Sequence, residues 1–324
     1  MLAIIYIRTG DASQLYIGST DRPTPRDNEL LVRVKACALN RMDILQRHGR
    51  YPLPPGASAI LGVEMAGIVE ACGASGNGRP GDRVFGLMLG GAYAQYCAIE
   101  EAAAIGMPES MSFEEAASLP EVWYTAYQAL HFIGGLQAGQ DVLIHGGASG
   151  VGMAAIQLAK MAQARRIVVT CGSEEKVAFC KSLGATHAVN YKADSFRSKA
   201  RTHLGVNLIV DMVGANYWTD NIASLSFDGR LVILAFMSGT KVADFDIAPI
   251  LGKRLRIEGT TLRSRSLAYQ CQLRDQFAAQ VLPRIRDGTI KHIVDRVFSW
   301  RDVADAHRYM ESNQSRGKIV LTVD

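Results

Sequence analysis

The chain has 324 residues, a formal net charge of +4, and 48% hydrophobic and 20% charged residues. A single hydrophobic core stops growing at roughly 250–300 residues, so this length favours two domains. The composition excludes an intrinsically disordered chain, and the small net charge requires no polyanion, so we expect no nucleic-acid partner.

The opening residues, 1–7, are mostly apolar, but Arg8 follows them at once. This run is too short for the core of a secretory signal, and we predict a first strand there. No apolar run reaches the ~18 residues that a membrane-spanning helix needs. We therefore expect a cytoplasmic protein without a membrane partner.

Residues 1–100 contain short strand candidates separated by glycine-rich turns. Apolar and polar side chains alternate in residues 30–36, which predicts a half-buried strand. One helical stretch, Asn40 to Gln46, interrupts the strands. Ser112 and Glu115 then have the spacing of a capping box, which predicts that a helix begins there.

From residue 141 onward, apolar strands alternate with amphipathic helices. This alternation predicts an α/β fold with a parallel sheet covered on both faces. The predicted strands are 141–145, 166–170, 187–190, 208–211 and 230–235, and the predicted helices are 150–164, 173–183 and 217–225. A longer helix is predicted over 267–286, and the tail returns to strands at 294–298 and 318–323.

A glycine-rich turn joins the first of these strands to its helix. It allows a tight bend and a close approach of backbone N–H groups to phosphate, and the helix N-terminus adds partial positive charge. A strand before and a helix after make this signal stronger than a glycine cluster that is a plain structural turn. We assign to the pyrophosphate of a dinucleotide the residues Gly147, Ser149, Gly150, Val151 and Gly152.

Ser149 also raises the possibility of a hydrolase, because it follows a strand and lies among glycines. The nucleophile elbow G-x-S-x-G fails here, since position 151 is valine where a glycine is required. We therefore interpret Ser149 as a hydroxyl donor to phosphate.

The end of the second strand of this region favours NADPH over NADH. An NAD site places a carboxylate there to hold the ribose 2′-OH, and this strand instead ends in Thr170-Cys171-Gly172-Ser173. Ser173, Lys176 and Tyr191 are our candidates for the 2′-phosphate side. The alternative is that Ser173 only caps a helix and Lys176 is a surface charge.

The whole chain resembles the zinc-independent quinone oxidoreductases of the medium-chain dehydrogenase/reductase superfamily, and looks closest to their p53-inducible subgroup. The resemblance rests on segments spread along the sequence, which are 38–51, 54–58, 60–67, 80–84, 145–152, 259–266 and 317–321. It implies a GroES-like, mostly-β catalytic domain built from both chain ends, a central doubly wound Rossmann domain, and a homodimer. The expected boundaries are 1–118 and 263–324 for the catalytic domain and 119–262 for the Rossmann domain.

Zinc-dependent relatives carry a cysteine ligand where this chain has Asn40 and a histidine ligand where it has Val63. Neither residue is a thiolate or imidazole donor, which Zn²⁺ prefers. The six cysteines and seven histidines also show no metal-type spacing. We expect no metal, and hence a substrate that accepts hydride without a Lewis acid, such as a quinone or an enone.

The resemblance assigns further site residues. Asn40, Tyr51 and Thr125 are the expected catalytic residues, with Asn40 and Thr125 near the nicotinamide. Further cofactor contacts are expected from Phe236, Met237, Leu262 and Lys318, and the expected substrate pocket consists of Tyr51, Trp123, Phe236 and Arg263. The simpler alternatives are a helix cap for Asn40, loop packing for Tyr51 and a core position for Trp123, while Asp43 and Gln46 are expected to be structural.

The predicted function is NADPH-dependent reduction of a quinone by direct hydride transfer. One alternative is a reductase of enones or 2-alkenals that uses the same cofactor. Another is a non-catalytic NADPH-binding protein of the lens-crystallin type.

Overall fold

The computed structural model describes residues 1–193 and 205–324. The chain divides into two compact units, which are described separately. Unit 1 consists of Met1–Tyr124 and Leu262–Asp324, and unit 2 of Thr125–Thr261. Among the described residues, no helix combines the length and apolar character needed to cross a membrane.

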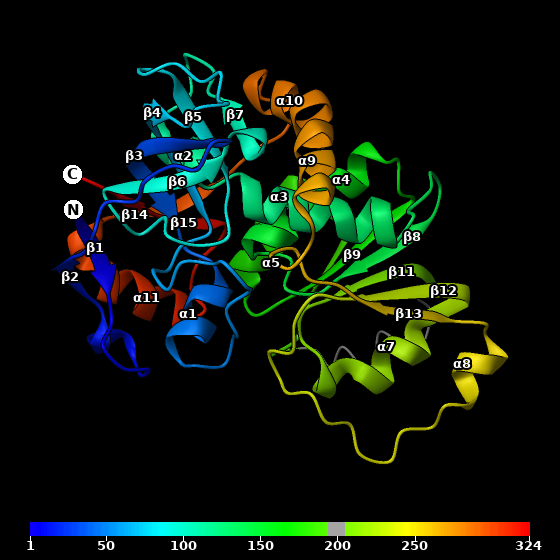
Figure 1. The fold of residues 1–324 in the computed structure, drawn as a ribbon. Helices are drawn as coiled ribbons and strands as arrows, with labels where there is room; N and C mark the ends of the chain where they lie inside the picture. The colour runs from blue at the N-terminus through cyan, green and yellow to red at the C-terminus, as the bar shows by residue number, and fades with distance from the viewer. Residues whose placement is uncertain (194–204) are drawn as a thin grey trace. The chain divides into compact units, whose positions relative to one another are not determined.

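Unit 1 is mostly β structure, and the first and last parts of the chain share one sheet in it (Figure 1). The sheet order is β14-β15-β3-β4-β5-β7, with β6 also paired to β3. The strands are β3 (Glu29–Ala38), β4 (Glu64–Cys72), β5 (Arg83–Leu87), β6 (Tyr96–Glu100), β7 (Ala104–Gly106), β14 (Val294–Ser299) and β15 (Lys318–Thr322), and a separate pair joins β1 (Leu2–Ile5) to β2 (Tyr16–Ser19). Because β15 is antiparallel to β3, the C-terminal return is part of the same core as the first hundred residues.

The helices of unit 1 follow most of the sequence predictions. They are α1 (Arg41–Arg47), α2 (Phe113–Ala117), the first part of α3 (Pro120–Tyr127), α9 (Leu267–Gln276), α10 (Leu282–Arg286) and α11 (Val303–Glu311). The capping box is confirmed, since Ser112 accepts from the Glu115 N–H and the Glu115 carboxylate accepts from the Ser112 N–H. The long helix predicted over 267–286 is confirmed in its bounds, with a π-helical turn at Phe277–Val281 between α9 and α10. Pro283, in the first turn of α10, cannot donate a backbone hydrogen bond to the preceding turn.

Unit 2 is a six-stranded, entirely parallel sheet with the order β10-β9-β8-β11-β12-β13. Its strands are β8 (Asp141–Ile144), β9 (Arg166–Cys171), β10 (His187–Asn190), β11 (Val206–Asp211), β12 (Leu225–Ile233) and β13 (Arg256–Gly259). In chain order this is 3-2-1-4-5-6, the doubly wound order of Rossmann domains. The order reverses direction between β8 and β11, and ligands bind outside the carboxyl ends of strands at such a point.

The helices of unit 2 cover both faces of its sheet. Within the described residues they include α4 (Gly150–Met161), α5 (Glu174–Leu183), α7 (Trp218–Ser224) and α8 (Ala248–Gly252). Right-handed crossovers place α4 and α5 on one face and α7 and α8 on the other, as Figure 1 shows for α4 and α7. A buried apolar cluster that includes Leu143, Ile209 and Leu231 packs the sheet against α7.

Leu143 tests this packing, because its side chain is fully buried in β8. Leu143→Ala is expected to reduce the free energy of unfolding by about 2–5 kcal/mol, since it removes buried methyl groups and leaves a cavity. Urea unfolding followed by circular dichroism measures the effect. The control is Leu251→Ala at a side chain that is 85% exposed, where a change below about 0.5 kcal/mol is expected. Equal effects of the two substitutions would contradict the assignment of Leu143 to the core.

Candidate functional site

In the turn after β8, the backbone leaves no room for a side chain at positions 147 and 152. A Cβ on Gly152 would lie 2.3 Å from the carbonyl oxygen of Gly146, and one on Gly147 would lie 2.8 Å from Cβ of Val169. The Gly147 N–H donates to the Thr170 carbonyl at 2.9 Å, which fixes the turn against β9. The turn therefore has the close backbone approach that a pyrophosphate site requires, at the point where the strand order reverses.

Ser149 is the N-cap of α4. Its hydroxyl oxygen accepts from the Gly152 N–H at 3.0 Å, and its hydroxyl faces the Met212 sulfur at 3.7 Å. Because the bond from Gly152 uses the hydroxyl oxygen and not its hydrogen, the expected donation of that hydrogen to phosphate stays a prediction. Gly150 and Val151 occupy the first turn of α4, where backbone N–H groups have no partner within the helix.

The end of β9 carries the candidates for the 2′-phosphate side, whose contact with a phosphate stays a prediction. Ser173 is the N-cap of α5 and accepts from the Lys176 N–H at 3.3 Å, which is the helix-cap alternative. The Glu174 carboxylate accepts from the Asn190 side chain at 2.8 Å and is thereby held at the end of β10. Tyr191 is partly exposed, and its hydroxyl is 2.7 Å from the position of a Cβ on Gly172. Tyr191 thus lies directly beside the tip of β9.

A buried polar chain runs beneath the glycine turn, and the sequence analysis did not single it out. Thr170 contacts His145 Nδ1 at 2.9 Å, His145 Nε2 contacts Asn221 Oδ1 at 2.7 Å, and Asn221 Nδ2 donates to Asp211 at 3.1 Å. The Asp211 carboxylate also accepts from the Val213 and Gly214 N–H groups. Because the Asn221 amide donates to Asp211 through Nδ2, its Oδ1 faces His145 Nε2 and accepts from it. Burial lowers the pKa of His145, in keeping with a neutral ring.

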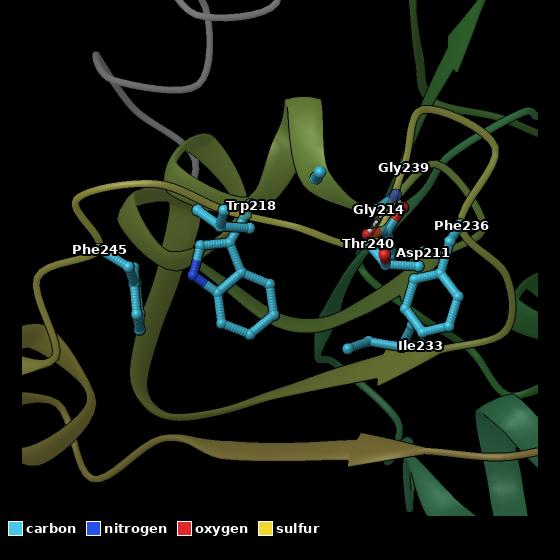
Figure 2. Close-up of a pocket in the computed structure, with 10 residues that line it drawn as sticks. Asp211, Gly214, Trp218, Ile233, Phe236, Gly239, Thr240 and Phe245 are labelled. Atoms are coloured by element: carbon cyan, nitrogen blue, oxygen red, sulfur yellow. Dashed lines mark hydrogen bonds between the residues drawn. The ribbon is translucent and has the colours of Figure 1, made fainter.

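A pocket of about 260 Å³ lies at the carboxyl ends of β11 and β12 (Figure 2). Its walls are mainly apolar, with Trp218 and Phe245 in an edge-to-face contact at 5.1 Å and Phe236 on the opposite side. Phe236 is 56% exposed, and its neighbour Met237 is also exposed. The structure thus places both predicted residues at the strand ends of unit 2.

In unit 1, three polar side chains from distant segments form a buried cluster. The Lys318 ammonium donates to Glu64 Oε1 at 2.7 Å, to Asn40 Oδ1 at 2.7 Å and to the Leu39 carbonyl at 2.8 Å. Asn40 Nδ2 donates to the same Glu64 oxygen at 2.8 Å, and the other Glu64 oxygen accepts from the Glu121 N–H at 2.8 Å. Lys318 is 2% exposed and Glu64 is fully buried.

This cluster corrects one prediction and limits another. All three ammonium hydrogens of Lys318 are used within unit 1, so the expected contact of Lys318 with a cofactor phosphate has no donor to make it. The Asn40 amide oxygen is likewise occupied, which leaves one amide hydrogen for any ligand. Asn40 is also the N-cap of α1, the simpler of its two expected roles.

A second buried chain begins at Asp43. Its carboxylate accepts from the Asn40 N–H at 2.8 Å and the Gly62 N–H at 3.0 Å, and the Tyr93 hydroxyl lies 3.4 Å away. Tyr93 in turn contacts His307 at 3.3 Å. Burial raises the pKa of Asp43 to about 6, while burial and then the Arg47 guanidinium lower the pKa of His307 to about 3.

Arg263 lies beside the ring of Tyr51 in unit 1. Arg263 donates to the Leu89 carbonyl at 2.7 Å and to Gln46 Oε1 at 2.8 Å, and its guanidinium carbon is 5.7 Å from the centre of the Tyr51 ring. Arg263 is 5% exposed, and its Nη2 has no hydrogen-bond partner among the described residues. Leaving a buried donor unpaired costs free energy, so this guanidinium nitrogen is a candidate for a further partner.

Other predicted residues have different surroundings. Trp123 is fully buried, donates to His292 at 3.0 Å and packs against Phe277, so it is a core residue of unit 1 and not a pocket wall. Thr125 and Leu262 are both buried. Asp43 and Gln46 are both buried and hydrogen-bonded within unit 1.

The residues that the sequence analysis missed are chiefly Glu64, His145, Asp211 and Asn221. A signal existed for Asp211, which follows an apolar strand where ligands collect in parallel sheets. Glu64 and Asn221 carried no comparable signal, since their partners are distant in the sequence.

Two family models match the chain. The "Alcohol dehydrogenase GroES-like domain" matches residues 26–109, and the "Zinc-binding dehydrogenase" model matches residues 150–279. A quinone oxidoreductase from Sus scrofa is 30% identical over 92% of this chain and 90% of its own length. A synaptic vesicle membrane protein VAT-1 homolog from Danio rerio is also 30% identical, and its match spans 94% of this chain but only 66% of that relative.

Solved structures are similar over the full chain. The quinone oxidoreductase of Escherichia coli in complex with NADPH is 26% identical with a TM-score of 0.89, and the match covers 100% of both chains. A protein named NAD-dependent alcohol dehydrogenase is 31% identical with a TM-score of 0.87, again over 100% of both chains. CurK enoyl reductase is 27% identical with a TM-score of 0.86, over 100% of this chain and 99% of its own.

The name of the second family model implies zinc, but the residues present do not fit a zinc ion. Within residues 1–193 and 205–324, no three His, Cys, Asp or Glu side chains gather as a metal site. In the buried cluster, the Asn40 and Glu64 oxygens already hold the Lys318 ammonium, and a second cation beside it would be repelled.

The buried cluster predicts a large effect of Lys318→Met. This substitution leaves the Glu64 carboxylate buried without its counter-ion and is expected to reduce the free energy of unfolding by about 3–5 kcal/mol. Adding Glu64→Gln is expected to restore much of the loss, because the uncompensated charge is then gone. Urea unfolding of the single and double variants measures both effects.

The control for this prediction is Arg254→Met, which breaks the exposed ion pair of Arg254 with Asp228. There the expected change is below about 1 kcal/mol. A Lys318→Met variant as stable as the wild type, or a double variant no better than the single one, would contradict a buried ion pair that depends on mutual compensation.

Asp43 predicts a pH dependence of stability. Its pKa is raised from 3.8 to about 6, so the folded state binds a proton more tightly than the unfolded state. The wild type is therefore expected to lose up to about 3 kcal/mol relative to Asp43→Asn as the pH rises from 4 to 7. Chemical unfolding of both proteins across this range gives the difference, and a difference that is constant with pH would contradict the raised pKa.

Proposed function

Because this chain belongs to the quinone oxidoreductase-like group of the medium-chain dehydrogenase/reductase superfamily, we propose that it is an NADPH-dependent quinone reductase that works without zinc. The observation that carries the proposal is the glycine turn after β8, where the backbone leaves no room for a Cβ at position 152. This turn opens α4 at the reversal point of the sheet, the place where Rossmann domains hold a dinucleotide.

Residues of unit 2 would hold the cofactor. Gly147, Gly150, Val151 and Gly152 offer backbone to the pyrophosphate. On the adenosine side, the tip of β9 carries no carboxylate, and Glu174 is held by Asn190, which favours the 2′-phosphate of NADPH. Lys176 and Tyr191 are the proposed contacts of this phosphate. When bound, NADPH supplies the hydride for the reduction.

Phe236, Met237, Leu262 and Thr125 stay our candidates for the nicotinamide side. Phe236 and Met237 are exposed at the strand ends of unit 2, a position open to a ligand. Thr125 begins unit 2.

Residues of unit 1 would bind the acceptor. The unpartnered Arg263 Nη2 is a donor suited to a carbonyl oxygen that gains negative charge as hydride arrives. Tyr51 offers a flat ring beside the same guanidinium, and flat quinones stack well on such rings. Asn40 can add one amide hydrogen. A quinone suits this site because it needs no metal to accept hydride, and the place of a cation is taken by Lys318.

A reductase of conjugated enones is the second candidate function. The similarity to CurK enoyl reductase favours it, and one Arg263 donor would stabilise an enolate as well as a quinone oxygen. The two functions differ in the kcat/KM ratio between quinones and alkenals. Cytoplasmic location and a homodimer remain part of the proposal.

The proposed function predicts that the purified protein oxidises NADPH with ortho- or para-quinones as acceptors. The rate is expected to be higher with quinones than with 2-alkenals, and higher with NADPH than with NADH as the hydride donor. Gly152→Ala is expected to raise the Kd for NADPH at least about tenfold, because its Cβ collides with the Gly146 carbonyl. Absorbance at the reduced nicotinamide band and fluorescence titration measure the two effects.

The matched control is Gly252→Ala, where a Cβ meets nothing within 4 Å and binding is expected to stay unchanged. Better turnover with NADH would contradict the cofactor assignment, and tight NADPH binding without turnover of any acceptor would contradict catalysis. Stoichiometric zinc in the active protein would contradict the metal-free mechanism.

A further inference from the structure

Unit 1 buries three of the lysine and arginine side chains that the structure describes. Arg47, Lys318 and Arg263 are 0%, 2% and 5% exposed. The Arg47 guanidinium forms an ion pair with Glu311, and the Lys318 ammonium forms one with Glu64 at 2.7 Å. Buried charges are normally compensated by a partner of opposite sign, and two of these three cations follow that rule.

Arg263 is the exception, because both of its hydrogen-bond partners are neutral. Nε donates to the Leu89 carbonyl at 2.7 Å, and Nη1 donates to the Gln46 amide oxygen at 2.8 Å. Among the described residues no carboxylate forms an ion pair with this guanidinium, and the charge of Asp43 acts on it only from a greater distance. Burial lowers the pKa of Arg263, as expected for a cation that loses water without gaining a counter-ion.

The surroundings of Nη2, the nitrogen without a partner, contain little that holds a side chain against it. Nη2 lies 3.0 Å from the position that a Cβ on Gly90 would occupy, so a larger residue there would press on this nitrogen. The half-buried Tyr51 ring has its centre 5.7 Å from the guanidinium carbon, and no hydrogen bond to another described residue holds it there. A ligand can therefore reach Nη2 by displacing one ring that is held only by packing.

We propose that Arg263 binds an anionic acceptor, namely a quinone or enone that carries a carboxylate beside its reducible carbonyl. As a statement about substrate class this rests on the proposed function, whereas binding of the anion does not. Nη2 has two hydrogens, so one can donate to the carboxylate and the other to the neighbouring carbonyl oxygen. The flat ring of the acceptor then packs against Tyr51.

The charge of the site favours a carboxylate over a phosphate. A carboxylate brings one negative charge, which matches the single uncompensated charge of Arg263, whereas a phosphate dianion would leave a buried excess. The reaction stays that of the proposed function. The acceptor gains a hydride from NADPH and a proton from solvent, the products are NADP⁺ and the reduced acceptor, and the carboxylate is unchanged.

Isothermal titration calorimetry tests the anion site without turnover. The probes are 1-hydroxy-2-naphthoate and its neutral amide, 1-hydroxy-2-naphthamide, which share the ring and the adjacent oxygen and differ in charge. The wild type is expected to bind the naphthoate at least about tenfold more tightly, because the hydrogen bond to a buried guanidinium is then charge-assisted. Equal affinity for the two probes overturns the proposal.

Variants assign this preference to one side chain. Arg263→Met is expected to remove the preference for the naphthoate, and Arg263→Lys is expected to keep part of it, because the charge remains. The matched control is Arg254→Met, at an exposed guanidinium paired with Asp228, which is expected to keep the full preference. A preference that survives in Arg263→Met overturns the assignment.

Steady-state kinetics test the substrate class. With NADPH as donor, kcat/KM is expected to be at least about tenfold higher for 1,4-naphthoquinone-2-carboxylate than for its carboxamide, mainly through a lower KM, and Arg263→Met is expected to remove the difference. If saturating NADP⁺ abolishes the calorimetric preference for the naphthoate, Arg263 serves the cofactor and the proposed substrate class is wrong.

The two levels of the proposal fail separately. If the naphthoate binds through Arg263 but no acceptor is turned over, the proposed function fails and the anion site is retained. If neutral quinones are turned over as well as the carboxylate, the substrate class is overturned and the proposed function is retained.

Discussion

The absence of side-chain atoms at Gly147 and Gly152 is the constraint on which unit 2 depends. Gly147 lets the turn after β8 pack closely against β9, and Gly152 lets the start of α4 pack against the carbonyl of Gly146, the first residue of the turn. The first turn of α4 is thereby directed at the reversal point of the sheet, where its unpaired N–H groups can meet an anion. The His145 chain ties the same region to the ends of β9 and β11.

Unit 1 buries several charged groups in the core beside its β-sheet. Lys318 and Glu64 compensate each other, and Asn40 and the Glu121 N–H satisfy what remains of their hydrogen-bonding capacity. The C-terminal strand β15 carries Lys318, so the return of the chain is held to its first hundred residues by charge as well as by strand pairing. Arg263 Nη2 has no hydrogen-bond partner among the described residues, and in unit 1 the Tyr124 hydroxyl shares this property.

The sequence analysis identified the α/β region well because its signals are local. Alternating apolar strands and amphipathic helices, and a glycine turn between a strand and a helix, each depend on neighbours in the chain. The long helix over 267–286 was predicted with the correct bounds, whereas the π-helical turn at Phe277–Val281, which precedes Pro283, was not predicted. The role of Trp123 could not be decided locally, since an aromatic in a helix suits a core and a pocket equally.

By itself, the sequence determined the two-part architecture, the position of the glycine turn and the lack of a carboxylate at the tip of β9. Only the tertiary structure decided which polar groups are satisfied inside the protein. Lys318 was expected to contact phosphate, but β15 pairs with β3 and carries its ammonium to Glu64, 254 residues away in the chain. Residue type reports what a side chain can bind, whereas its partner depends on which distant segments the sheet brings together.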